Sequence, residues 1–110
     1  MTSKKPASAK RAKPLRDVQQ TKQFLKDWER LSESGRYDLN RLKTAMLLLV
    51  GGDPLPAEYL DHGLHGEWED YRECHIGGDF LLIYKLWKMG KVEQVIFARC
   101  GTHAELFKSS

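Results

Sequence analysis

The sequence is poor in cysteine and proline and has no long hydrophobic run. Of its 110 residues, two are cysteine and four are proline, and the longest apolar stretch is residues 45–50. A membrane-spanning helix needs about 20 apolar residues, so none is predicted. The basic N-terminus is followed by no signal-like apolar stretch, and we therefore expect a cytoplasmic protein with reduced thiols. The length allows one domain and excludes a kinase, a TIM barrel or a two-domain dehydrogenase.

Acidic residues are missing from the first 16 positions, which hold six lysines and arginines. The net charge of the whole chain is +3, so the remainder carries a net charge of −3. We expect residues 1–14 to form a basic, disordered tail and residues 15–110 to form a single folded domain. Such a tail can bind nucleic-acid phosphates or simply keep the protein in solution, and composition does not decide between the two.

Two amphipathic helices are predicted in the first half of the domain. Over residues 21–34, Phe24, Trp28 and Leu31 share one face, with Leu25 alongside. A second helix over residues 38–50 begins at Asp38, a residue favoured at helix N-caps. Its apolar stripe consists of Leu39, Leu42, Ala45, Met46, Leu49 and Val50. The short connection between the helices predicts an antiparallel hairpin.

The second half changes to the pattern of strands. After an extended loop at residues 54–67, aromatic and β-branched residues dominate three segments: 68–76, 80–87 and 92–99. With a short first strand at residues 15–19, the order is β-α-α-β-β-β. This predicts an α+β fold in which the helix hairpin packs on one face of an antiparallel-dominated sheet. The opposite face is left for function.

Histidine and cysteine residues in the second half raise the question of a metal site. Cys74 and His75 are neighbours in a predicted strand, so their side chains point to opposite faces. His62 and His65 lie three residues apart in a loop, and the chain contains no Cys-x-x-Cys pair. We therefore expect no metal ion and no cofactor.

Acid–base chemistry is the better interpretation of these residues. His75 and Asp79 flank the first turn of the predicted meander, Arg99 ends its last strand, and His103 follows four residues later. In an antiparallel meander these residues and Phe80 meet at one end of the sheet. Metal-free RNA cleavage needs one group that accepts the 2′-OH proton, another that protonates the leaving 5′ oxygen, and a cation for the phosphate. Each residue also has a plainer interpretation: Asp79 as a turn residue, and Arg99, like Arg72, as a salt-bridge partner.

Four sequence blocks, in order and at fixed spacing, resemble the YafQ branch of the RelE/ParE toxin superfamily. Written as patterns, they are DH-x-L-x-G-x-W (61–68), YRECHI (71–76), LLIYK (81–85) and R-x-G-T-H-x-x-LF (99–107). The resemblance covers roughly residues 15–107 and implies a RelE-like toxin of a bacterial type II toxin–antitoxin system. It also implies a ribosome-dependent mRNA endonuclease that inhibits translation without a metal.

The resemblance implies roles for individual residues. It makes His103 a general acid or base, with His75 and Asp79 supplying the opposite proton transfer, and it leaves open which histidine is the acid. His62 would assist at the edge of the site, and the substrate-binding residues would be Arg99, Phe80 and Phe107. Phe80 stands where the family usually has tryptophan. The implied partners are a cognate antitoxin, the ribosome and mRNA, with operator DNA bound only through the antitoxin complex and no membrane.

Two other functions fit the same fold. One is a toxin relative that does not cut RNA, such as a gyrase inhibitor, and the other is an antitoxin-binding or regulatory module. The placement of His75 and His103 with Arg99 favours the nuclease, because a pure binding protein does not need these groups together.

Overall fold

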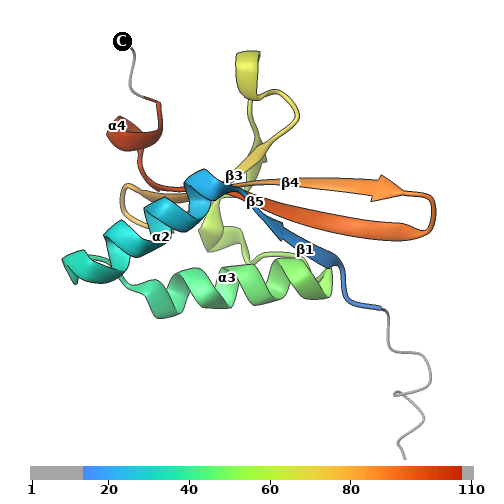
Figure 1. The fold of residues 1–110 in the computed structure, drawn as a ribbon, viewed down its shortest axis with the longest axis horizontal. Helices are drawn as coiled ribbons and strands as arrows, with labels where there is room; N and C mark the ends of the chain where they lie inside the picture. The colour runs from blue at the N-terminus through green and yellow to red at the C-terminus, as the bar shows by residue number, and fades with distance from the viewer. Residues whose placement is uncertain (1–13, 108–110) are drawn as a thin grey trace, which may run out of the picture.

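A helical hairpin lies along one face of a five-stranded sheet in the computed structural model, which describes residues 14–107 (Figure 1). The basic tail predicted for residues 1–14 lies, except for Pro14, outside the described residues. The helices and strands in chain order are β1 (Asp17–Gln20), α2 (Lys22–Ser34), α3 (Leu39–Gly51), β2 (His62–Gly63), β3 (Arg72–Gly77), β4 (Phe80–Met89), β5 (Val92–Thr102) and α4 (His103–Leu106). Two short 3₁₀ turns, Ala57–Tyr59 and Gly66–Trp68, interrupt the loop between α3 and β3.

Side-chain caps and glycines set the ends of the two long helices. The Thr21 hydroxyl accepts a hydrogen bond from the Phe24 backbone N–H, and Asp38 accepts two such bonds from the first turn of α3. Gly35 and Gly52 end the helices with φ values of 66° and 76°, a conformation that favours glycine. The predicted hairpin is confirmed. Among the described residues, no helix is long and apolar enough to cross a membrane.

The helical periodicity correctly identified the apolar side chains that face the sheet, with one exception. Leu42, Ala45 and Leu49 of α3 are buried, as are Phe24 and Leu31 of α2. The expectation that Leu25 packs beside the α2 stripe is wrong, because its side chain is 50% exposed. The reason is angular: Leu25 follows Phe24 by one residue, about 100° around the helix, which turns it away from the sheet.

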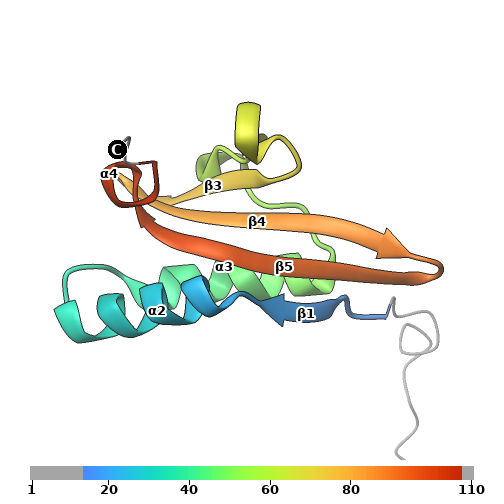
Figure 2. The ribbon, with the colours of Figure 1, turned by 45° about the horizontal axis from the view of Figure 1, so that its top comes forward.

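The sheet order is β1-β5-β4-β3-β2, with β1 parallel to β5 and all other pairs antiparallel (Figure 2). This confirms the predicted α+β fold with an antiparallel-dominated sheet. Two elements were not predicted: strand β2, inside what was expected to be an extended loop, and helix α4. The expected strand at residues 68–76 also starts later, because Trp68 belongs to a 3₁₀ turn.

The central strand β4 separates two apolar layers. Residues 80–84 are all buried, as expected for a strand covered on both faces. Leu82 and Tyr84 face the helices and join their core, whereas Leu81 and Ile83 face the opposite side. On that opposite side, α4 and the loop before β3 cover part of the sheet through Leu106, Leu64, Trp68, Tyr71 and Phe107. The functional residues described next lie on this second face.

Helix α2 takes the place of a continuation of β1 along the last part of β5. Strand β1 pairs with β5 only as far as Phe97. Beyond this point the Thr21 hydroxyl donates to the Ala98 carbonyl at 2.7 Å, and the Asp27 carboxylate accepts from the Cys100 N–H at 3.1 Å. The edge of β5 is therefore satisfied by side chains of the helix rather than by another strand.

Candidate functional site: a histidine cluster around Glu73

Three histidines from three different elements gather on the face opposite the helices. His62 comes from β2, His75 from β3, and His103 from the first position of α4. The ring centroids of His62 and His75 are 6.3 Å apart, and those of His75 and His103 are 6.0 Å apart. Strand alternation explains the placement of His75, because its neighbour Cys74 is buried in the helix-side core. The pairing of β2 with β3 brings in His62.

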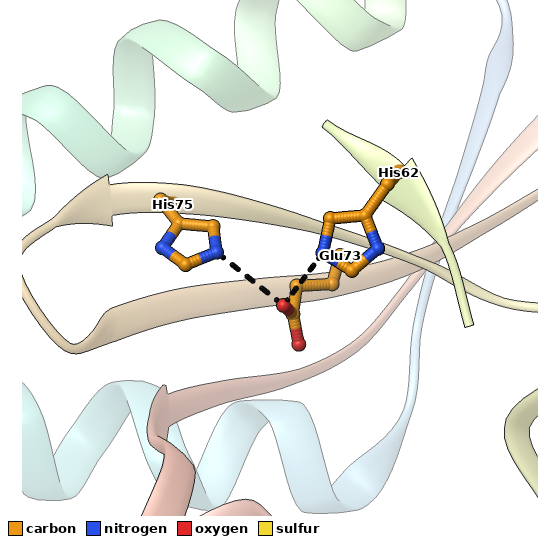
Figure 3. A group of neighbouring side chains, drawn as sticks. All are labelled: His62, Glu73 and His75. Carbon is orange, nitrogen blue, oxygen red and sulfur yellow. Dashed lines mark hydrogen bonds and ion pairs between the residues drawn. The ribbon is translucent and has the colours of Figure 1, made fainter. Parts of the chain in front are cut away.

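The three imidazoles surround one buried carboxylate, that of Glu73. Its Oε2 atom lies 3.0 Å from His62 Nε2, 3.4 Å from His75 Nε2 and 3.8 Å from His103 Nε2. Figure 3 shows His62 and His75 converging on Glu73. The Glu73 side chain is only 5% exposed, so its charge depends on these partners rather than on water. Sequence reasoning missed Glu73, although its position two residues before His75 places both side chains on one face of β3.

His62 contacts hydrogen-bond acceptors through both ring nitrogens. Its Nδ1 lies 3.0 Å from the Gly63 carbonyl oxygen and its Nε2 lies 3.0 Å from Glu73 Oε2. A carbonyl oxygen and an ionised carboxylate can only accept, so the tautomer of the His62 ring decides which of the two nitrogens donates. The two contacts hold the ring between the Gly63 carbonyl and Glu73.

Asp79 orients the third histidine. His103 Nδ1–H donates to Asp79 Oδ1 at 2.5 Å, and the His103 backbone N–H donates to the same oxygen at 3.4 Å. The hydrogen bond from His103 lowers the pKa of the Asp79 carboxyl, which therefore stays ionised. This arrangement leaves His103 Nε2 on the Glu73 side of the ring. The resemblance grouped Asp79 with His75, whereas in the structure its hydrogen bonds go to His103.

An aromatic border lies next to His103. The Phe107 ring is 5.9 Å from His103 and 6.0 Å from Trp68, measured between centroids. The predicted role of Phe80 in substrate binding needs correction, because this side chain is 2% exposed and packs 4.9 Å from Tyr37 in the helix-side core. Phe80 follows the alternation of β4 and faces the helices, so it has no free face for stacking.

Arg99 lies on the same face but on β5, two strands away from β3, which carries Glu73 and His75. The register pairs Glu73 with Ile83 and Ile83 with Arg99, which places Arg99 two strand spacings, about 10 Å, from Glu73. Its guanidinium donates from Nε and Nη2 to the buried Asp27 carboxylate at 2.8 and 3.1 Å. Topology correctly predicted the gathering of His75, Asp79 and His103, while the ion pair with Asp27 matches the alternative interpretation of Arg99.

Asp27 is a second acidic residue that sequence reasoning missed. Burial alone would raise its pKa, but hydrogen bonds from Arg99, Arg30 and the Cys100 N–H outweigh this effect and lower the pKa. Arg30 Nη1 donates to Asp27 at 3.0 Å from the next turn of α2. The carboxylate is therefore ionised and fixes the Arg99 side chain against α2. No local motif marks it, because its partners are 72 and 73 residues away in sequence.

The cysteines take no part in this chemistry. Burial raises the pKa of both Cys74 and Cys100 to about 12, so both thiols are neutral and unsuited to nucleophilic attack. The groups available for proton transfer are thus the imidazoles and carboxylates. A set of this kind can accept one proton and donate another near neutral pH, with Arg99 as a nearby fixed cation. His62, Glu73 and His75 can also hold a metal ion, since their ligand atoms lie within 4.8 Å of one another.

This combination of fold and site defines a small RelE-like toxin, with two helices under an antiparallel-dominated sheet and a histidine–carboxylate cluster on the open face. The chain belongs to the YafQ family: a family model described as "Bacterial toxin of type II toxin-antitoxin system, YafQ" matches residues 16–108. The resemblance noted from the four sequence blocks is therefore confirmed.

Relatives from two bacteria support the assignment. The "mRNA interferase toxin YafQ" of Escherichia coli (strain K12) is 43% identical over 93 residues, covering 84% of this chain and 96% of the relative. The toxin in the crystal structure of the E. coli DinJ–YafQ complex is 43% identical and superposes with a TM-score of 0.70. That match covers 84% of this chain and 98% of the E. coli toxin. A metal-bound toxin from Helicobacter pylori is 35% identical, with a TM-score of 0.75. That match covers 84% of this chain and 100% of the H. pylori toxin.

Proposed function

We propose that this chain is an endoribonuclease toxin that cleaves mRNA on the ribosome by histidine acid–base catalysis and so inhibits translation. The observation that carries the proposal is the convergence of three imidazoles on Glu73, with His103 held by Asp79. The E. coli relative is named an mRNA interferase, and we assign the same activity to this chain. Its site of action is then the cytoplasm, where mRNA and ribosomes meet.

The proposed reaction is an internal transfer within the RNA. A base removes the proton from a ribose 2′-OH, and this oxygen attacks the adjacent phosphorus. The bond to the 5′ oxygen breaks, an acid protonates that oxygen, and the products are a 2′,3′-cyclic phosphate and a free 5′-OH. We assign one transfer to His103 through Nε2 and the other to His75 with Glu73, and we leave the direction of each transfer open.

Supporting residues complete the proposed site. Asp79 keeps Nδ1 of His103 protonated and so directs Nε2 toward the substrate. Within residues 14–107, Arg99 Nη1 has no hydrogen-bond partner, which leaves it available for a phosphate oxygen. His62 assists at the edge of the site through its contact with Glu73, and the exposed part of Phe107 lies where a base can stack beside His103.

A cognate antitoxin is the proposed regulatory partner. The E. coli relative has been crystallised in complex with the antitoxin DinJ, and we propose an equivalent partner for this chain. Operator DNA would be bound only through the antitoxin in such a complex. An upstream reading frame encoding a small DNA-binding antitoxin is the simplest genetic support.

Primer extension on mRNA after controlled expression tests the proposal. The wild-type chain should give codon-phased 5′ ends, and His103→Ala and Arg99→Ala should lose them, the former by about 10²–10⁴ in rate. His65→Gln is the matched control, since His65 is an exposed loop histidine outside the cluster. Growth arrest with intact mRNA and altered DNA topology would support a gyrase inhibitor instead. Absence of any phenotype would support a regulatory module, and wild-type cleavage by His103→Ala would refute its catalytic role.

A further inference from the structure

The face of the sheet that carries the histidine cluster continues onto the β4–β5 hairpin. The pairing of β4 with β3 ends at Tyr84, and the rest of the hairpin extends beyond β3 (Figure 2). Strand alternation places Lys85 and Trp87 on the same side of β4 as Ile83, which is the side of the site. This part of the face contains a hollow of about 420 Å³. Its lining includes Gln19, Lys85, Trp87, Gln94 and Ile96.

The hollow brings together the kinds of side chain that hold a nucleotide. Trp87 is 42% exposed, and its indole N–H donates to Gln94 Oε1 at 2.6 Å, which fixes the orientation of the ring. An exposed indole of this kind is a surface on which an RNA base can stack. Lys85 Nζ lies 5.6 Å from the centroid of the Tyr71 ring, and no carboxylate of the described residues pairs with it. Its charge is therefore available to a phosphate oxygen.

The amides around Trp87 supply hydrogen bonds of both kinds. The Gln94 oxygen accepts from Trp87, so its NH₂ group is left to donate to a ligand. The Gln19 side chain also lines the hollow and has no hydrogen-bond partner within residues 14–107. An amide both donates and accepts, as the edge of a base does. The hollow thus offers a ring for stacking, a cation for phosphate and amides for the base edge.

A row of aromatic rings connects the histidine cluster with this hollow. The Phe107 ring lies 5.9 Å from His103 and 6.0 Å from Trp68, between centroids. Tyr71 follows at 5.1 Å from Trp68, and Lys85 lies over Tyr71. The contacts of Trp68 are edge-to-face, at 75° and 76°, so these rings are not stacked on one another. The row leads from the proposed cleavage site toward Trp87 along one face of the molecule.

The distance between the hollow and the cluster suits a single RNA strand. Ile83 on β4 pairs with both Glu73 and Arg99. Trp87 is four residues further along the strand, which corresponds to about 13 Å. An RNA strand with its reacting phosphate at the cluster therefore reaches Trp87 within a few nucleotides.

We propose that Trp87, Lys85 and Gln94 form a second nucleotide-binding subsite for the single-stranded mRNA next to the cleaved bond. One base stacks on Trp87, its edge meets the Gln94 amide, and a neighbouring phosphate contacts Lys85. The proposal rests on the proposed nuclease function, because the bound RNA is the substrate of that reaction. Trp87 takes no part in proton transfer, so its loss should weaken RNA binding and leave bond breaking intact.

Fluorescence anisotropy of the full chain with a labelled single-stranded RNA tests the subsite without cleavage. The probe carries 2′-O-methyl groups throughout, so that no 2′-OH can attack. We expect Trp87→Ala to weaken the affinity about 5- to 100-fold, and Trp87→Phe to restore most of it because a phenyl ring also stacks. Lys85→Gln should weaken it less. Met89→Ala is the matched control, since Met89 is 58% exposed on the same side of β4 outside the hollow, and it should bind as the wild type does.

Cleavage of mRNA on ribosomes, measured over a range of substrate concentrations, separates binding from chemistry. Trp87→Ala should raise KM and leave kcat unchanged at an unchanged melting temperature. Absence of probe binding by the wild type, or equal affinity of the wild type and Trp87→Ala, would overturn the subsite. A lower kcat at unchanged KM would also overturn it. Loss of antitoxin binding by Trp87→Ala at full RNA affinity would assign the hollow to a protein instead. RNA binding that depends on Trp87 in a chain that never cleaves would leave the subsite standing and overturn only the nuclease function.

Discussion

Replacement of Asp27 by asparagine removes the charge from a carboxylate that is 0% exposed and bonded on both oxygens. Oδ2 accepts from Arg99 Nε and the Cys100 N–H, while Oδ1 accepts from Arg99 Nη2 and Arg30 Nη1. An asparagine amide keeps one of these oxygens and turns an NH₂ group toward two donors. Two of the four hydrogen bonds are therefore lost in either amide orientation.

The lost bonds set the size of the effect. Hydrogen bonds to a charged group contribute about 1.5–3 kcal/mol each, and breaking a buried ion pair costs about 3–5 kcal/mol. The side chains of Arg99 and Arg30 are 21% and 43% exposed, so water can replace part of what they lose. We expect Asp27→Asn to lower the free energy of unfolding by about 3 kcal/mol at neutral pH.

The same substitution should change how stability depends on pH. Folding lowers the pKa of Asp27, so its contribution is complete above its unfolded value of 3.8 and is lost as pH falls through the folded pKa. The difference in stability between wild type and Asp27→Asn should thus be constant near neutrality and shrink in acid.

Urea denaturation at a series of pH values measures both effects. Asp70→Asn serves as the control, because Asp70 is exposed and should change stability by less than about 0.5 kcal/mol. Equal stability of the wild type and Asp27→Asn at pH 7, or a difference that does not shrink in acid, would refute the assignment of Asp27 as an ionised anchor for Arg99.

Three other substitutions give distinct outcomes. Leu82→Ala, at a residue that is 0% exposed, should lower the free energy of unfolding by about 2–5 kcal/mol in denaturation. Asp79→Asn should reduce cleavage at unchanged melting temperature, because the exposed carboxylate orients His103 without supporting the core. Gly101→Ala puts a side chain at a φ of 152°, a conformation that favours glycine, and places its Cβ 2.7 Å from Glu105 Oε1 of the α4 capping box, so it should cost about 1 kcal/mol or more, visible as a lower melting temperature.

The long elements of the fold were predictable because each repeats a local pattern. Helices α2 and α3 have apolar periodicity and capping residues, and β3 to β5 are rich in β-branched and aromatic residues with turns between them. Strand β2 has only two residues and is defined by its pairing with β3. Two residues are too few to show an alternating sequence pattern, so the sequence did not predict it. Helix α4 is four residues long, and its one local signal was the Thr102-x-x-Glu105 capping box.

The site was predictable as far as topology determines it. Antiparallel connection of neighbouring strands brought His75, Asp79 and His103 to one end of the sheet. The partners Glu73 and Asp27 were missed because strand register and the packing of α2 on β5 create their contacts. Phe80 was misassigned because its position at the start of β4 suggested the site, whereas the alternation of the strand decides its face.

Strand β2 is joined to the sheet through just two residue pairs, and both of its residues are exposed. Such a segment detaches at a lower free energy than the whole domain unfolds. The contact between His62 Nε2 and Glu73 Oε2, at 3.0 Å, also holds the long loop before β3 against the sheet. The rate at which the amides of β2 exchange with deuterium therefore reports on this contact, in an experiment that needs neither RNA nor ribosomes.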